Sequence, residues 1–410
     1  MSAEALQKTV LNAAHVALGG TMVDFGGWEM PLWYKGGAIK EHLAVIQAAG
    51  MFDTSHMAVV MGQGPGIREF LNYALTKDIA ELRLERAAYG IVLNEKGHAI
   101  DDSIIYPLAE DRFALVVNAG MGAKVVAHLK ALPGGSAFTW TDLTGKCAKI
   151  DIQGPAAFSI LRPFIADADA VFAKFPYFSF KGDFDFTKSS VHLTNGSPLM
   201  LSRTGYTGEQ GFEIFLPVDA AVAFWNELLA AGESRGLTPC GLAARDSLRT
   251  GAVLPLSHQD IGAWPFINNP WPWALPFAED GSFSKNFMGQ DALNPATAEH
   301  TLAFAGYDPR KVEQGASVIH EGQDIGTVLT CVADVAIGRP AGNDGPIVSL
   351  ADPAKPEGWS PRGLVCGFVK VKKHLEPGAT IVLKDGRREI NVQVVTDIRP
   401  LRTARKALVA

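Results

Sequence analysis

Several features that define large classes of proteins are scarce or missing in this sequence of 410 residues. Its four cysteines, Cys147, Cys240, Cys331 and Cys366, lie far apart and form no CxxC pair. This spacing favours buried, reduced thiols in a cytosolic protein over disulfides or zinc ligands. The ten histidines are equally scattered, without an HxxxH or HxH pair. We therefore expect no metal site.

Excess positive charge and long apolar runs are also absent. The net charge of −6 at pH 7 argues against a nucleic-acid or anionic-membrane partner. No run of 18 or more apolar residues occurs, so the sequence predicts no membrane span. The N-terminal segment lacks the charged-then-apolar pattern of a secretory signal and the Arg-rich bias of a transit peptide. These absences predict a cytoplasmic protein without nucleic-acid or membrane partners.

The signals that are present mix helices with strands. At 410 residues the chain is too long for one hydrophobic core, so more than one domain is expected. Many strands in the first 250 residues arrive as hairpin candidates, which favours mixed or antiparallel sheets and the α+β class. Residues 264–290 are dense in proline and aromatics and predict no regular element. Beyond them, short strands separated by glycine turns predict a small β barrel, with a long surface loop at 338–363.

An unusual carboxylate stands in the stretch LNEKGHAIDDSIIY, residues 93–106. Its first half predicts a turn and its second half a strand. Alternate residues of a strand share a face, so Asp102 should point the same way as Ile100, Ile104 and Tyr106. A carboxylate on such an apolar wall either accepts hydrogen bonds from a neighbouring loop or meets a cationic or N–H-bearing ligand. The local pattern leaves both interpretations open.

Two further stretches place polar groups among apolar ones. In SRTGYTGEQGFEIF (202–215), a glycine-rich turn carries Tyr206, and Glu213 follows between two apolar residues. This is either a β-hairpin with an exposed glutamate or one wall of a pocket for a flat heterocycle. In CGLAARDSLRTGAVLP (240–255), helical spacing puts Arg245 on the apolar face. An arginine so placed binds a carboxylate, which belongs either to the protein or to a ligand.

Seven motifs occur together and in order along the chain. They are DFGGWEMP (24–31), EHLAVIQAAGMFDTSHM (41–57), AAYGIVLNEKGHAIDDSIIY (87–106), FALVVNAG (113–120), IQGPAA (152–157), SRTGYTGEQGFEI (202–214) and GLAARDSLR (241–249). This series resembles the aminomethyltransferases of the glycine cleavage system, the T-proteins, and their relatives among folate-dependent demethylases. The resemblance covers residues 15–250 closely and the C-terminal region loosely.

The resemblance implies a three-domain, cloverleaf-like α+β fold around a central channel that holds tetrahydrofolate. A folate-binding region at 1–285 would contain two interleaved α+β subdomains, the second at about 56–148, and a C-terminal β-barrel domain would occupy 286–410. The implied reaction transfers a one-carbon unit from the aminomethyl-dihydrolipoyl group of a lipoylated carrier protein, the H-protein, to the co-substrate tetrahydrofolate. Ammonia is released and 5,10-methylene-tetrahydrofolate is formed.

The resemblance also assigns site residues. Asp102 would be the catalytic residue, in contact with the folate near N10. The implied folate contacts are Tyr89, Asn118, Tyr177, Tyr206, Glu213 and Arg245. A terminal arginine also contributes in the family, and both Arg402 and Arg405 are candidates here.

This chain departs from the family pattern near the predicted mouth of the channel. Pro272 stands where a glutamate is usual, and His258 stands where a glycine is common. Two alternatives therefore stay open. The first is a tetrahydrofolate-dependent demethylase of a small S-, O- or N-methyl substrate, which His258, Trp271 and Trp273 would contact. The second is a folate-binding protein without enzymatic activity.

Overall fold

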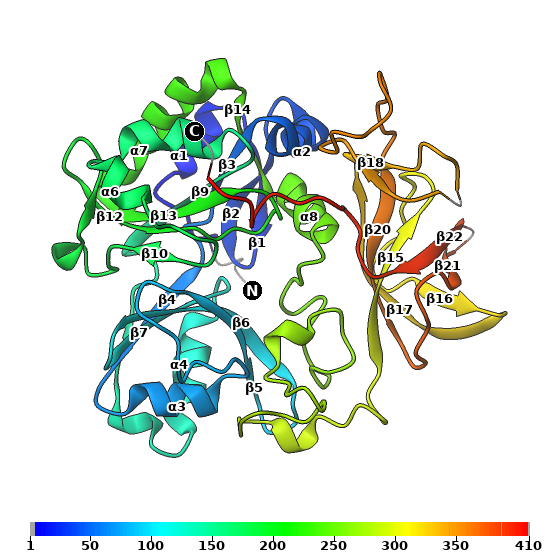
Figure 1. Ribbon diagram of the computed structural model, residues 1–410, viewed down its shortest axis with the longest axis horizontal. Helices are drawn as coiled ribbons and strands as arrows, with labels where there is room; N and C mark the ends of the chain where they lie inside the picture. Colours follow the sequence, from blue (N-terminus) through cyan, green and yellow to red (C-terminus); the bar gives the residue numbers. More distant parts are fainter. Residues whose placement is uncertain (1–4, 344, 387, 409–410) are drawn as a thin grey trace.

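The computed structural model describes residues 5–343, 345–386 and 388–408. Figure 1 shows three lobes around α8 (Leu242–Gly251) and the loop that follows it. The lobes are built on a seven-stranded sheet, a five-stranded sheet and a closed six-stranded barrel. Within these described ranges, no helix has both the length and the apolar character needed to cross a membrane. The mixture of sheets, helices and a C-terminal barrel confirms the predicted α+β class.

The first lobe has a mixed sheet buried on both faces. Its strand order is β10-β12-β13-β9-β3-β14, with β11 paired to β12, and only β14 runs parallel to its neighbour. Every residue of β3 and β9 is buried. Helices α5 and α7 pack on one face of the sheet, whereas the other face is covered by the second lobe at β9 and by α2 (Gly37–Gln47) and α8 at β3. The elements are β3 (Ala49–Asp53), β9 (Cys147–Gln153), β10 (Phe180–Lys181), β11 (Val191–His192), β12 (Pro198–Ser202), β13 (Gly211–Pro217), β14 (Leu237–Pro239), α5 (Ala157–Leu161), α6 (Ala168–Phe172) and α7 (Val218–Gly232).

The second lobe is an antiparallel sheet with the order β5-β6-β7-β4-β8. Helices α3 and α4 pack their apolar stripes against one of its faces. The other face, which carries Tyr106, packs against Phe180 and Phe215 of the first sheet. The elements are β4 (Ala58–Gln63), β5 (Ala88–Leu93), β6 (Ala99–Ala109), β7 (Arg112–Val117), β8 (Thr139–Asp142), α3 (Ile67–Ala74) and α4 (Gly122–Ala131).

The third lobe is the predicted β barrel. Six antiparallel strands close on themselves in the order β15-β20-β17-β16-β21-β22, so that no strand edge is left unpaired. The strands are β15 (His300–Gly306), β16 (Ser317–His320), β17 (Gln323–Asp334), β20 (Leu364–Val371), β21 (Thr380–Asp385) and β22 (Arg388–Val395). Two-stranded ribbons and two further helices complete the fold: β1 (Thr21–Phe25), β2 (Trp28–Trp33), β18 (Ile337–Gly338), β19 (Val348–Ser349), α1 (Asn12–Ala17) and α2 (Gly37–Gln47).

Two segments outside these elements join the lobes. Residues 264–290, all of them described, contain no α-helix and no strand, as predicted. They include a 3-10 turn at Pro272–Ala274 and the first residue of another at Gln290–Ala292. The C-terminal segment leaves the barrel and runs past α8 to the first lobe (Figure 1). Its Arg399 is fully buried, pairs with Asp334 of β17 at 2.7 Å and donates to the backbone oxygen of Thr207. The barrel is thereby fixed to the turn that carries Tyr206.

One detail of β6 differs from the alternation expected for residues 99–109. The pairing with β5 passes from Val92–Asp101 to Leu93–Ala99, so Ile100 lies at a bulge and has no partner. Ile100 therefore packs against the core under α3 and α4, not beside Asp102 as predicted. Ile104 and Tyr106 do pack on the face toward the first sheet. A bulge inserts one residue and so reverses the alternation locally.

Candidate functional site

A cavity of about 1870 Å³ lies between the lobes. Strands of both sheets, α8 with the loop after it, and the C-terminal segment line its wall. Its volume exceeds the range of about 300–1,000 Å³ that is usual for small-molecule pockets, so it has room for an elongated ligand. The expected catalytic residue, the expected folate contacts and both candidate arginines line this cavity: Asp102, Tyr89, Asn118, Tyr177, Tyr206, Glu213, Arg245, Arg402 and Arg405.

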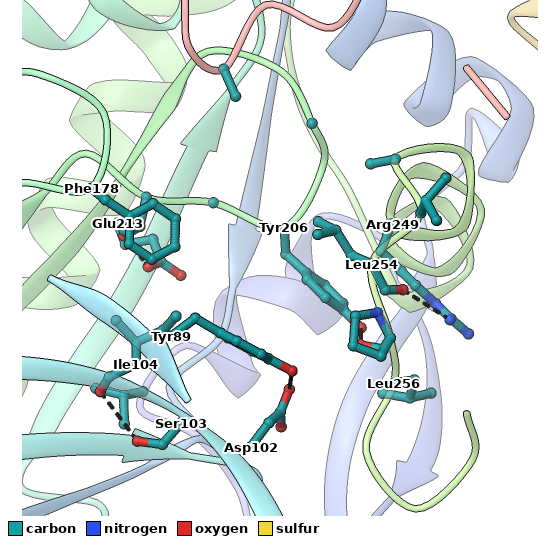
Figure 2. A pocket seen from close by; sticks show the side chains of 18 of the residues that line it. Tyr89, Asp102, Ser103, Ile104, Phe178, Tyr206, Glu213, Arg249, Leu254 and Leu256 are labelled. Atoms are coloured by element: carbon teal, nitrogen blue, oxygen red, sulfur yellow. Dashed lines mark hydrogen bonds between the residues drawn. The ribbon is translucent and has the colours of Figure 1, made fainter. Parts of the chain in front are cut away.

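Asp102 stands on β6 and turns its carboxylate into the cavity. The Tyr89 hydroxyl on β5 donates to Oδ2 at 2.8 Å, and Nδ2 of Asn118 donates to Oδ1 at 2.6 Å. Figure 2 shows the Tyr89 hydroxyl pointing at this carboxylate, with Tyr206 on the far side. The two donors fix the direction of the carboxylate and leave lone pairs on both oxygens for a ligand.

A second carboxylate, Asp101, lies directly behind Asp102 and is fully buried. It accepts hydrogen bonds from the backbone N–H of Asn118 at 2.8 Å, from its Nδ2 at 2.7 Å and from the Ser257 hydroxyl at 2.7 Å. Burial, together with the negative charge of Asp101, raises the pKa of Asp102 to about 7. Burial also raises the pKa of Asp101 itself. Because the pKa of Asp102 lies close to neutral pH, a cation that enters the site strongly favours the ionised form of this carboxyl group.

At the other end of the cavity Glu213 of β13 is part of a buried chain of charges. Lys149 of β9 pairs with Oε1 of Glu213, and the Thr204 hydroxyl donates to Oε2. Lys149 also pairs with Asp151 at 2.7 Å, which in turn pairs with Arg245 of α8 at 3.0 Å. Although burial opposes ionisation, the charges of Lys149 and Arg245 hold the pKa of Asp151 below its ordinary value. The two anions and two cations balance within the buried chain.

Aromatic rings cover the cavity wall between these ends. The Arg245 guanidinium lies 4.9 Å from the centre of the Tyr206 ring, and the Tyr206 hydroxyl donates to the backbone oxygen of Pro255. The Arg405 guanidinium lies 5.6 Å from the centre of the Tyr177 ring. Such rings offer apolar stacking area with fixed orientation. In Figure 2, Glu213 and Asp102 lie on different sides of the open space that Tyr206 faces.

The two open questions about Arg245 and Glu213 receive answers from these contacts. The carboxylate partner of Arg245 is a protein group, Asp151. Glu213 is 7% exposed, so the alternative of an exposed hairpin glutamate is wrong.

Sequence reasoning missed the buried pair Lys149 and Asp151. The signal was there, since the two residues alternate in the strand CAKIDIQ and therefore share one of its faces.

At the mouth, one proposed substrate contact is wrong. Trp271 is fully buried, donates its indole N–H to the Val253 oxygen at 2.9 Å and packs on Phe368, so it does not reach the cavity. Trp273 does line the cavity, is 45% exposed and lies 4.9 Å from the Tyr89 ring. His258 is half exposed, with Nε2 3.8 Å from Oδ1 of Asp101.

Comparison with known proteins places this chain in a family. The family profile described as the GCVT N-terminal domain matches residues 11–264. An aminomethyltransferase of Deinococcus deserti is 36% identical over 337 residues, which cover 82% of this chain and 87% of the relative. One from Xanthomonas axonopodis pv. citri is 41% identical over 300 residues, which cover 72% of this chain and 75% of the relative. The chain belongs to the aminomethyltransferase family of the glycine cleavage T-proteins.

Comparison with solved structures supports the same family. The crystal structure of the glycine cleavage system aminomethyltransferase T from Bartonella henselae matches with a TM-score of 0.75 and 29% identity, covering 95% of this chain and 97% of that one. The predicted T-protein fold is confirmed. So is the predicted activity, that of an aminomethyltransferase of the glycine cleavage system with tetrahydrofolate as co-substrate.

Proposed function

We propose that tetrahydrofolate binds along the cavity with its bicyclic ring toward Glu213 and its reacting nitrogens toward Asp102. We propose further that the one-carbon unit arrives as an aminomethyl group on the dihydrolipoyl arm of a carrier protein. The observation that carries this assignment is the Asp102 carboxylate. It is held by two hydrogen-bond donors inside a cavity and has a pKa of about 7.

The role of Asp102 is electrostatic. The transferred carbon forms new bonds to N5 and N10 of the folate, whose two N–H protons pass to the leaving groups. Its bond to nitrogen breaks to release ammonia, and its bond to sulfur breaks to leave the dihydrolipoyl thiol. Positive charge develops on this carbon as the leaving groups depart. An oriented carboxylate stabilises that charge without having to reorganise. Tyr89 keeps the carboxylate in place as a neutral donor, since burial and the charge of Asp102 raise the pKa of its hydroxyl well above the ordinary value. Apolar neighbours such as Ile104 and Leu254 keep water away from the reactive carbon.

The role of Glu213 is recognition. Each of its carboxylate oxygens has one protein donor, Lys149 or Thr204, whereas a carboxylate offers about four acceptor sites. The remaining sites fit the adjacent N–H groups of a pterin. Tyr206 and Tyr177 supply flat surfaces for the rings of the ligand. Catalysis is then mainly positioning and electrostatics, without a covalent enzyme intermediate.

The test uses purified protein, tetrahydrofolate and an aminomethylated lipoyl carrier protein. We expect methylene-tetrahydrofolate and ammonia in equal amounts, with no product when either substrate is omitted. A parallel panel of methylated small molecules without carrier should give no methyl-tetrahydrofolate. Methyl-tetrahydrofolate from the panel would instead identify a demethylase, and binding of folate without any turnover would identify a binding protein. Either result would contradict the proposed donor.

A further inference from the structure

His56 is a cavity residue that the reaction described above does not use. It lies in the link between β3 and β4, where the chain crosses from the first sheet to the second. Its side chain lines the same cavity as Glu213 and Arg245 and is only 5% exposed. The Phe25 ring packs edge-on against the imidazole, with 5.5 Å between ring centres and an angle of 88°. The ring is therefore held in place.

His56 carries a ring nitrogen whose hydrogen-bonding capacity no other described residue uses. Its Nδ1 is buried and has no hydrogen-bond partner among the described residues. A buried polar nitrogen without a partner is rare in folded proteins and costs stability. Burial also lowers the pKa of His56 to about 4, so the ring is neutral near pH 7. A neutral imidazole carries one N–H donor and one acceptor nitrogen.

Glu213 and Arg245, which line the same cavity, are each limited to one role in hydrogen bonding. The Glu213 carboxylate can only accept hydrogen bonds, and the Arg245 guanidinium can only donate them. His56 can do both. The polar edge of a reduced pterin carries neighbouring N–H donors together with a carbonyl and a ring-nitrogen acceptor, and His56 adds a group that can pair with either kind.

We propose that His56 is a further folate-binding residue that forms hydrogen bonds to the polar edge of the bicyclic ring. This inference rests on the proposed function, because it assumes that the folate ring lies at the Glu213 end of the cavity. His56 does not touch the reacting carbon in this arrangement. It selects the heterocycle and helps to orient it.

The test compares His56→Asn with His56→Leu, because asparagine and leucine have similar size and differ in hydrogen bonding. Dissociation constants are measured by calorimetry for tetrahydrofolate and for N-(4-aminobenzoyl)glutamate, a probe that lacks the heterocycle. We expect His56→Leu to weaken tetrahydrofolate binding by about tenfold or more and His56→Asn by roughly threefold or less. Binding of the fragment should be the same in wild type and both variants.

Two controls separate this inference from its alternatives. His128 also has a buried ring nitrogen without a partner among the described residues but does not line the cavity, so His128→Leu should leave tetrahydrofolate binding unchanged. Equal binding by His56→Asn and His56→Leu, or equal weakening of both ligands, would assign His56 a packing role and overturn the proposal. Wild-type protein that binds no tetrahydrofolate would overturn the proposed function itself. A thermal melt of each variant checks that it is folded at the temperature of the binding measurement.

Discussion

Replacing Asp102 by asparagine removes its charge and very little else. The introduced amide has the same shape, its oxygen can accept from Asn118, and its nitrogen can donate to the Tyr89 hydroxyl, which also accepts. Two unit charges about 4 Å apart attract each other by roughly 4 kcal/mol at an effective dielectric constant near 20. This corresponds to about three orders of magnitude in rate. Because part of the attraction is already present before the transition state, we expect Asp102→Asn to lower kcat by about 100- to 1,000-fold.

The assay follows methylene-tetrahydrofolate formation from an aminomethylated carrier between pH 5.5 and 8.5. In wild type, kcat/KM for folate should rise with pH around an apparent pKa near 7, because the ionised form of Asp102 is the active one. The variant should lose this dependence and keep its folate affinity within a few-fold. Asp101→Asn is the matched control. It removes the neighbouring negative charge and should move the apparent pKa of the profile downward.

A thermal melt tests the same electrostatics without catalysis. The pKa of Asp102 is higher in the folded protein than in the unfolded chain, so this carboxyl group binds more protons in the folded state between pH 4 and about 7, and its contribution to stability falls as pH rises through this range. Asp102→Asn removes this contribution, so the Tm of the variant relative to wild type should increase from pH 5 to pH 8. Full activity in the variant, with a pH profile like that of wild type, would refute the electrostatic role of Asp102.

Four further substitutions test the surroundings of the site. Lys149→Met leaves Glu213 buried without its cation, so unfolding in urea should show a loss of roughly 3–5 kcal/mol, and the KM for folate should rise. Arg405→Ala should raise the KM for folate more than Arg402→Ala does, because Arg402 already pairs with Asp397. An equal rise in KM for both variants, measured over a series of salt concentrations, would contradict this ranking. Asp334→Asn should cost roughly 3–5 kcal/mol at pH 7. Although burial opposes ionisation, His42 and Arg399 hold the pKa of Asp334 well below its ordinary value. The difference in stability between this variant and wild type should therefore shrink in melts as the pH falls below about 4. A difference that stays constant with pH would exclude an ionic role for Asp334.

Local patterns predicted the parts of the fold that depend on neighbouring residues. Alternation on β6 correctly placed Ile104 and Tyr106 on the face toward the first sheet, and the proline-rich segment 264–290 forms no α-helix or strand. Ile100 was misplaced because one inserted residue at a bulge leaves no trace in hydrophobic alternation. Trp271 was misplaced because an irregular segment has no period from which side-chain direction can be derived.

The site itself required more than local patterns. Single motifs left the partners of Asp102, Glu213 and Arg245 open, and only their order along the chain indicated a common pocket. The decisive contacts join residues far apart in sequence: Lys149 and Glu213 are separated by 64 positions, and Asp151 and Arg245 by 94. Which distant strand lies beside a polar residue depends on sheet order, and the order here places β9 between β3 and β13.

A crystal structure of the protein with bound tetrahydrofolate tests the central claim most directly. We predict that the ligand occupies the large cavity with its pterin ring against Glu213, and that a carboxylate oxygen of Asp102 lies about 3–4 Å from the N5–N10 edge, where the carbon is received. A ligand bound in the cavity with this edge remote from Asp102 would contradict the account.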